Sequence, residues 1–258
     1  MGHRILVMSP LHNLGATLSA GFIAHTMSFD NKTSALAFTQ TESHLPGYLG
    51  IEEIKDPTRS VMQIVRLIDN GALADQDILD YAHSYAKNSW LMSVSDKSLE
   101  GHDRDQVVVH VYKRVPTDIC VCDNSDDIDT PLTRDLLSAS DMLFIVVDMS
   151  GKAADRLQDW LAHPILKDFG NVYILLNKYS EVVSSLRDYA KRVHVPANKI
   201  CKLHFNPGIQ KCTLNHKLPE LLPQVRDLDP RVANLSMDMA EIIQCINGDI
   251  LVKNKKGI

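Results

Sequence analysis

Short apolar runs alternate with segments of helical periodicity along most of the 258-residue chain. Seven of these runs have the length and composition of buried strands. They are Arg4–Met8, Ser34–Thr39, Trp90–Val94, Asp118–Asp123, Met142–Val147, Asn171–Asn177 and Lys199–Phe205. Strands that alternate with helices pair in parallel through crossover connections. The pattern therefore predicts an α/β fold, with a doubly wound, mostly parallel sheet of about seven strands and helices on both faces.

The segments between these runs predict helices, because their apolar residues recur three and four positions apart. Those with the clearest periodicity are Ala16–Met27, Asp56–Gly71, Asp75–Asn88, Leu132–Ser140, Asp155–Leu166, Leu218–Leu222 and Asp229–Ile246. Asp103–Arg114 is ambiguous, since its valines favour a strand, but its position before a strong strand favours a crossover helix, which we predict. We find no internal repeat, and we expect one domain over residues 1–246 and a frayed, lysine-bearing tail over residues 247–258.

Composition narrows the classes of function. The net charge of −5 argues against a basic surface that coats nucleic acid, so we do not expect DNA to be a partner. No apolar run approaches the roughly 20 residues of a membrane-spanning helix, and no signal-peptide pattern is seen. The few lysines of the tail are insufficient for stable docking on a bilayer, so we do not expect the protein to bind a membrane either. The five scattered cysteines favour reduced thiols and a cytoplasmic location, with Cys120 and Cys122 as small buried hydrophobes.

The stretch RILVMSPLHNLGATLSAGFIAH, Arg4–His25, predicts a strand, a glycine-containing loop and a helix. In a phosphate-binding loop, backbone N–H groups and the positive end of the helix face the phosphate, a lysine neutralises its charge, and a Ser or Thr hydroxyl holds Mg²⁺. Gly15 and Thr17 stand in the required places, but Ala16 stands where the lysine should be. Taken alone, the loop also suits an ordinary turn, and Thr17 suits a residue that caps its own helix.

Further motifs follow in an order that resembles the ParA/MinD family of P-loop ATPases, over roughly residues 4–225. Against the family's loop K-G-G-x-G-K-T-T, the segment LHNLGATL places Leu11 and Ala16 at the two lysines and Thr17 at the metal-binding threonine. The segment SALAFTQTES resembles the family's second strand, but Thr39 and Thr41 stand where an acidic residue orients the attacking water.

Two later strands extend the resemblance. Asp123, in DICVCDN, falls on the acidic residue that closes the Walker B strand, and Asn177, in NVYILLNKYS, falls on the residue that contacts adenine. From the residues alone, both also suit turns that follow strands. The loop substitutions make the sequence similar to the atypical TadZ/CpaE-like subgroup, localisation factors of pilus machinery, and to related proteins of secretion and conjugation systems.

The resemblance implies ATP with Mg²⁺ as the candidate ligand. The implied nucleotide-binding residues are Pro10, Leu11, His12, Asn13, Leu14, Gly15, Ala16, Thr17, Leu18 and Asn177, and the implied metal ligands are Thr17 and Asp123. We name no catalytic residue and expect little or no hydrolysis, because phosphoryl transfer depends on positioned charge and both lysines and the acidic residue are replaced. His12 is either a solvated loop histidine or a partial substitute for the lost charge.

The function implied by the resemblance is that of a localisation, assembly or partition adaptor. We expect a cytoplasmic homodimer whose partners are proteins of a pilus, secretion, conjugation or partition machinery. Two alternatives stay open: a slow ATPase switch that positions plasmids or other cargo, and a scaffold that binds no nucleotide.

Overall fold

The computed structural model describes residues 2–29, 31–40, 43–51, 64, 66–67, 70–72, 74–92, 102–221 and 233–256. At its centre lies an eight-stranded sheet in the order β3-β4-β2-β5-β1-β6-β7-β8. The strands are β1 (His3–Met8), β2 (Ser34–Phe38), β3 (His83–Ala86), β4 (Ser89–Met92), β5 (Ile119–Asp123), β6 (Met142–Val147), β7 (Val172–Tyr179) and β8 (Ile200–His204). All neighbours pair in parallel except β3, which runs antiparallel to β4 at the edge. The predicted doubly wound α/β fold is confirmed.

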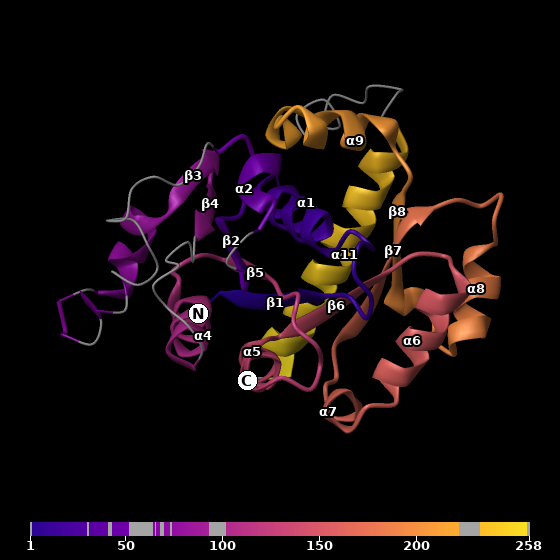
Figure 1. Cartoon of the computed structure of the whole chain (residues 1–258), viewed down its shortest axis with the longest axis horizontal. Helices are drawn as coiled ribbons and strands as arrows, with labels where there is room; N and C mark the ends of the chain where they lie inside the picture. Colours follow the sequence, from indigo (N-terminus) through magenta and orange to yellow (C-terminus); the bar gives the residue numbers. More distant parts are fainter. Residues whose placement is uncertain are drawn as a thin grey trace.

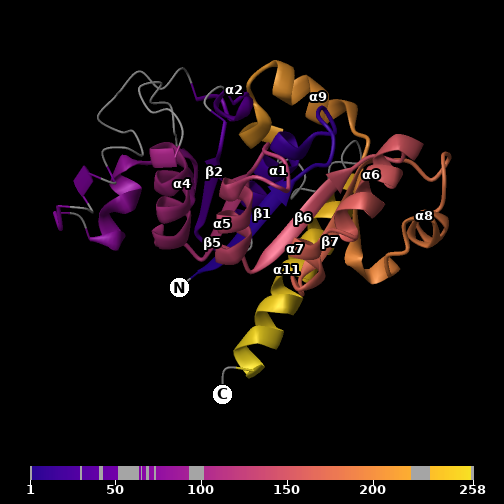
Figure 2. The same ribbon diagram turned by 60° about the horizontal axis from the view of Figure 1, so that its bottom comes forward.

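Helices cover both faces of the sheet (Figures 1 and 2). One face carries α4 (His102–Arg114), α5 (Pro131–Ala139), α6 (Gly151–Leu161), α7 (Pro164–Lys167) and α8 (Leu186–Val193). The other carries α1 (Ala16–Phe29), α2 (Leu45–Tyr48), α9 (Pro207–Leu214) and α11 (Ala233–Lys256). Each face has its own apolar cluster, and because both faces are covered, the central strands β5 and β6 are buried at every position.

Some of the helix predictions are confirmed and others are wrong in part. The ambiguous segment Asp103–Arg114 is helical as α4. The predicted helix Asp75–Asn88 is instead a 3₁₀ helix, η2 (Asp75–Tyr81), followed by the hairpin of β3 and β4. Asn88 adopts φ 58° at that turn, which returns the chain along the sheet edge. The predicted helix Asp56–Gly71 lies largely outside the described residues.

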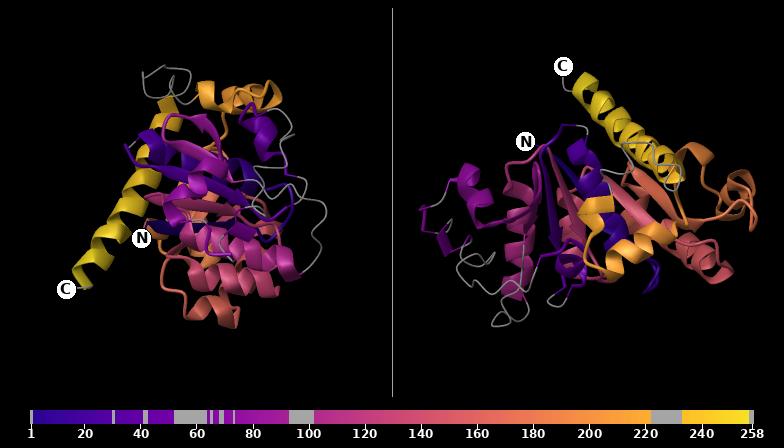
Figure 3. Two further views of the ribbon diagram at one scale, coloured as in Figure 1. Left: turned by 90° about the vertical axis from the view of Figure 1, so that its left-hand side faces the viewer. Right: turned by 90° about the horizontal axis from the view of Figure 1, so that it is seen from above.

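The predicted helix end at Ile246 is also wrong, because α11 continues to Lys256. The following residues contain one glycine and no proline, and an isolated glycine weakens a helix by about 1 kcal/mol without ending it. Figures 2 and 3 show this last part of α11 extending beyond the sheet. In the described part of the chain, no helix combines the length and apolarity needed to cross a bilayer.

The smaller elements were predicted only in part. Segment 218–221 is helical, at the predicted position. Helices α8 and α9 and the 3₁₀ helix η3 (Ala197–Lys199) were not anticipated. Ser185 directly precedes helix α8 and caps it, because its hydroxyl accepts from the backbone N–H of Asp188. Cys120 and Cys122 are fully buried in β5, as expected.

Candidate functional site

The loop between β1 and α1 is held at both of its ends. Near its start, the Ser9 hydroxyl lies 2.8 Å from the backbone oxygens of Leu11 and Val146, which ties the loop to the end of β6. At its end, the Ser19 N–H donates to Gly15 O at 2.9 Å. The N–H groups that precede Ser19 in the first turn of α1 therefore have no carbonyl of their own helix to bond. This is the arrangement from which a strand-loop-helix unit binds an anion.

Gly15 is required by the shape of this loop. Its φ is +89°, and a Cβ built on it would lie only 2.3 Å from Nδ2 of Asn177. The same Asn177 nitrogen donates to Leu14 O at 2.7 Å. Asn177, predicted as an adenine contact, is 5% exposed and holds the loop from the end of β7, so its observed contact is with the loop itself.

The two positions that correspond to lysines carry apolar side chains packed inward. Leu11 and Leu14 pack against the apolar cluster beneath α4, α5 and α6. Ala16 and Leu18 pack against the cluster on the opposite face. His12 and Asn13 are exposed, and Asn13 adopts φ 65°. The loop is thus fixed by hydrophobic contacts on both faces of the sheet, with its polar tip in solvent.

Thr17 and Asp123 meet at the carboxyl end of the sheet. Thr17 lies in the first turn of α1, and Asp123 is the last residue of β5, the strand that pairs with β1. The Thr17 hydroxyl donates a hydrogen bond to the Asp123 carboxylate. Asp123 is 1% exposed, and its Oδ2 has no acceptor or donor partner in the described part of the chain. Burial raises the pKa of this carboxyl to about 6 from an ordinary value of 3.8, and the Thr17 hydrogen bond opposes that rise.

A buried polar network lies next to Asp123. The Thr39 hydroxyl donates to Asn124 Oδ1 at 3.0 Å, and Asn124 Nδ2 donates to the Thr133 hydroxyl at 2.7 Å. Thr39 is fully buried, so its hydroxyl is committed to this network rather than to a solvent water. Thr41, the other threonine at the position of the acidic residue, lies outside the described residues. The sequence analysis did not identify Asn124 or Thr133, which are both buried. The signal that the sequence offered for Asn124 was its position directly after Asp123, the last residue of a strand.

The residues present fit a hydrated Mg²⁺ with a nucleotide. Mg²⁺ takes oxygen ligands and keeps several waters, so it is commonly held by one or two protein groups together with substrate phosphates. Thr17 Oγ1 and the unpartnered Asp123 Oδ2 form such a pair. Among the described residues, no group of three or more His, Cys, Asp or Glu side chains is arranged to hold a metal.

Comparison with known proteins identifies the fold. No family model matches the sequence, and no curated protein sequence matches it. Among solved structures, the chain is similar to the MinC:MinD cell division protein complex of Aquifex aeolicus (TM-score 0.69, 14% identity, 95% of this chain and 96% of that chain). It is also similar to a putative plasmid partition protein of Borrelia burgdorferi bound to AMPPNP (TM-score 0.66, 13% identity, 96% of this chain and 99% of that chain). A third similar structure is a ParA family ATPase of Chlorobium tepidum (TM-score 0.65, 16% identity, 84% of this chain and 91% of that chain). The chain therefore has the fold of ParA/MinD P-loop NTPases.

Proposed function

We propose that this chain is a ParA/MinD-like adaptor that binds ATP with Mg²⁺ and hydrolyses it little or not at all. The observation that carries the proposal is the Thr17–Asp123 pair beside a loop that keeps the required Gly15; the buried Oδ2 of Asp123 has no partner among the described residues. An unpartnered buried carboxylate oxygen costs free energy, and a magnesium ion between it and the phosphates would remove that cost.

The weak step is hydrolysis. Leu11 and Ala16 cannot neutralise the charge that develops on the transferred phosphoryl group, and Thr39 cannot act as a carboxylate toward water. Each such loss costs on the order of 3 kcal/mol of transition-state stabilisation, and the losses within one site do not simply add. The site is in this sense a degenerate version of a P-loop.

Some positive charge remains near the loop. His12 is exposed at its tip. Lys178 is exposed at a bulge between Asn177 and Tyr179, with φ 54°, next to the asparagine that contacts the loop. We infer that these two side chains partly replace the absent lysines in binding, without restoring the geometry that hydrolysis requires.

The biological role that follows is localisation, assembly or partition through protein partners. Structural relatives include a MinC:MinD complex and partition proteins, which supports a role of this general kind. We propose a cytoplasmic homodimer, and a pilus, secretion, conjugation or partition machinery as its setting. Dimerisation is tested by light scattering after size-exclusion chromatography, with and without a non-hydrolysable ATP analogue.

Binding and turnover are tested by calorimetry and by phosphate release with Mg-ATP. We expect heat of binding in the wild type, loss of that heat in Thr17→Ala and no phosphate release above a blank. Asp135→Asn is the matched control for substitutions of Asp123, because Asp135 is exposed on α5. Clear turnover that Asp123→Ala abolishes would instead support the ATPase switch, and absence of heat would support the nucleotide-free scaffold.

A further inference from the structure

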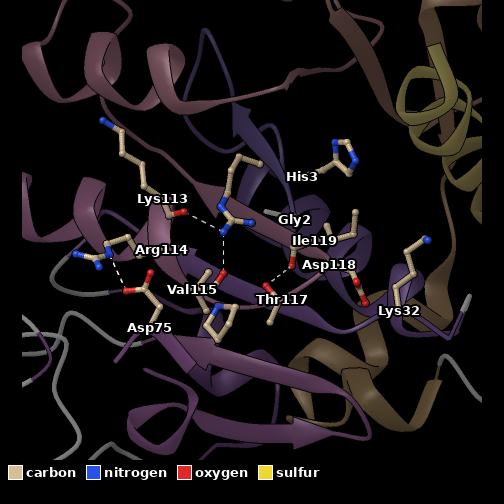
Figure 4. Close-up of a pocket in the computed structure, with 12 residues that line it drawn as sticks. Gly2, His3, Lys32, Asp75, Lys113, Arg114, Val115, Thr117, Asp118 and Ile119 are labelled. Carbon is tan, nitrogen blue, oxygen red and sulfur yellow. Dashed lines mark hydrogen bonds and ion pairs between the residues drawn. The ribbon is translucent and has the colours of Figure 1, made fainter. Parts of the chain in front are cut away.

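A second candidate ligand site lies at the opposite edge of the sheet from the loop. A cavity of about 610 Å³ opens beside the first residues of β1, the start of β5 and the end of α4. Its size is within the range of about 300 to 1,000 Å³ that is typical of small-molecule sites. Figure 4 shows Lys113, Arg114 and Asp75 on one side of the cavity and Lys32 and Asp118 on the other. The cavity is independent of the proposed nucleotide site.

Arg4, one of the lining residues, is a buried cation with unused donors. It is 5% exposed, and its Nη2 donates to Lys113 O at 3.0 Å and to Val115 O at 2.7 Å, the bonds drawn in Figure 4. These bonds satisfy carbonyls at the end of α4. Nε and Nη1 have no hydrogen-bond partner among the residues that the structure describes. A guanidinium has five N–H groups, so three of them remain unpaired.

The charges around the cavity do not balance. The lining includes the four cations Arg4, Lys32, Lys113 and Arg114 but only the two carboxylates Asp75 and Asp118. Arg114 Nε is paired with Asp75 Oδ1 at 2.7 Å. Asp118 accepts two hydrogen bonds from Thr33 and lies near Lys32. The lining therefore has an excess of two positive charges, contributed by Arg4 and Lys113.

We propose that this cavity binds a small phosphorylated metabolite, a phosphate monoester of nucleotide size or smaller. A phosphate monoester has three terminal oxygens and up to two negative charges, which match the three unpaired N–H groups of Arg4 and the excess of two positive charges. Nε and Nη1 are covered by protein in this conformation, so binding through them requires the Arg4 side chain to shift toward the cavity that it lines, at the expense of its bonds to Lys113 O and Val115 O. Lys113 and Lys32 contribute flexible charges at the rim.

The test is a calorimetric titration of the protein at low salt with each of three compounds: inorganic phosphate, ribose 5-phosphate and uncharged ribose. We expect binding of one or both phosphates and none of ribose. We expect Lys113→Ala, which keeps the backbone oxygen that Arg4 bonds, to weaken binding about tenfold and Arg4→Gln to abolish it. Lys191→Ala, on the exposed surface of α8, is the control and should bind as the wild type does.

Two further measurements keep the outcome interpretable. Hydrogen exchange should show protection of the amides of Val115, Thr117, Asp118 and Ile119 on addition of ligand, and this readout does not depend on whether Arg4→Gln folds. Asp123→Asn should retain phosphate binding, because it alters only the opposite edge of the sheet. The proposal is overturned if the wild type binds neither phosphate, or if Lys113→Ala binds as tightly as the wild type and the amides gain no protection.

Discussion

Replacing Asp123 with asparagine should separate the stability of the fold from the binding of metal. At pH 7.5 the folded protein holds an ionised carboxylate that is 1% exposed, with a pKa of about 6 in place of 3.8. A difference of about 2 in pKa corresponds to about 3 kcal/mol of folding free energy. The amide removes the charge, keeps the shape, and leaves a buried polar group partly unpaired at a cost of about 1 kcal/mol. We therefore expect the nucleotide-free variant to be more stable than the wild type by about 2 kcal/mol at this pH.

The same pKa fixes the sign of the pH dependence. Between about pH 4 and 6 the folded state binds a proton at Asp123 that the unfolded state has released. In this window the wild type gains stability from this group as the pH falls, and Asp123→Asn does not. The advantage of the variant should therefore be about 2 kcal/mol at pH 7.5 and should shrink or reverse at pH 4.5. The metal responds in the opposite direction, because Mg²⁺ binds the ionised carboxylate and its affinity should rise through pH 6.

Urea denaturation at both pH values, with and without Mg-ATP, measures all of these quantities. Mg-ATP should stabilise the wild type and Asp135→Asn but not Asp123→Asn. The reasoning is refuted if Asp123→Asn is less stable than the wild type at pH 7.5, or if the difference between the two proteins is the same at both pH values.

Three further predictions concern the loop and the thiols. Gly15→Ala should lower the free energy of unfolding by about 1 to 3 kcal/mol in urea, because of its φ of +89° and its contact with Asn177. Ala16→Lys should tighten ATP binding about tenfold in calorimetry, because it restores a cation at the phosphate. Oxidised glutathione should join Cys201 and Cys245, whose Sγ atoms lie 3.2 Å apart, into a disulfide detectable by peptide mass mapping. The neighbouring thiol and burial raise the pKa of Cys201, so this reaction should be faster at alkaline pH.

Each of these predictions has a control and a contrary outcome. Gly170→Ala, where an added Cβ meets no atom within 4 Å, is the control and should change the free energy of unfolding by less than about 0.5 kcal/mol. If Gly15→Ala is no more destabilising than Gly170→Ala, the strain argument is contradicted. Unchanged affinity in Ala16→Lys would mean that no phosphate lies near that position. A disulfide that involves Cys212 in place of Cys245 would contradict the observed pairing of thiols.

The sheet could be predicted because its central strands are buried on both faces, and a run such as Met142–Val147 has few other interpretations. Strand β3 could not be predicted, because Ala82 and Tyr85 are three positions apart, which is also the spacing of apolar residues on one face of a helix. In the structure these two residues pack against the apolar clusters from the segment that leads into and forms a hairpin. The meeting of Thr17 and Asp123 was predictable, because the carboxyl ends of neighbouring parallel strands lie at one edge.

Other parts of the sites depend on contacts that no local pattern contains. Arg4 looks like the first polar residue of a strand, yet its guanidinium bonds carbonyls 109 and 111 residues further along the chain. Asn124 acquires its role only when β2 and α5 bring Thr39 and Thr133 to it. Motif reasoning assigned Asn177 to adenine from its place after a strand, and could not anticipate its contact with Leu14 O across the sheet.

The central claim is that the fold retains ATP binding and has lost efficient turnover. A single measurement tests both parts: protein in excess over radiolabelled Mg-ATP is incubated, separated from free nucleotide, and the nucleotide that stays with it is identified. We expect the protein to retain the label as ATP and to lose it in Thr17→Ala. Retained or released ADP would contradict the loss of turnover, and the absence of any retained label would contradict nucleotide binding itself.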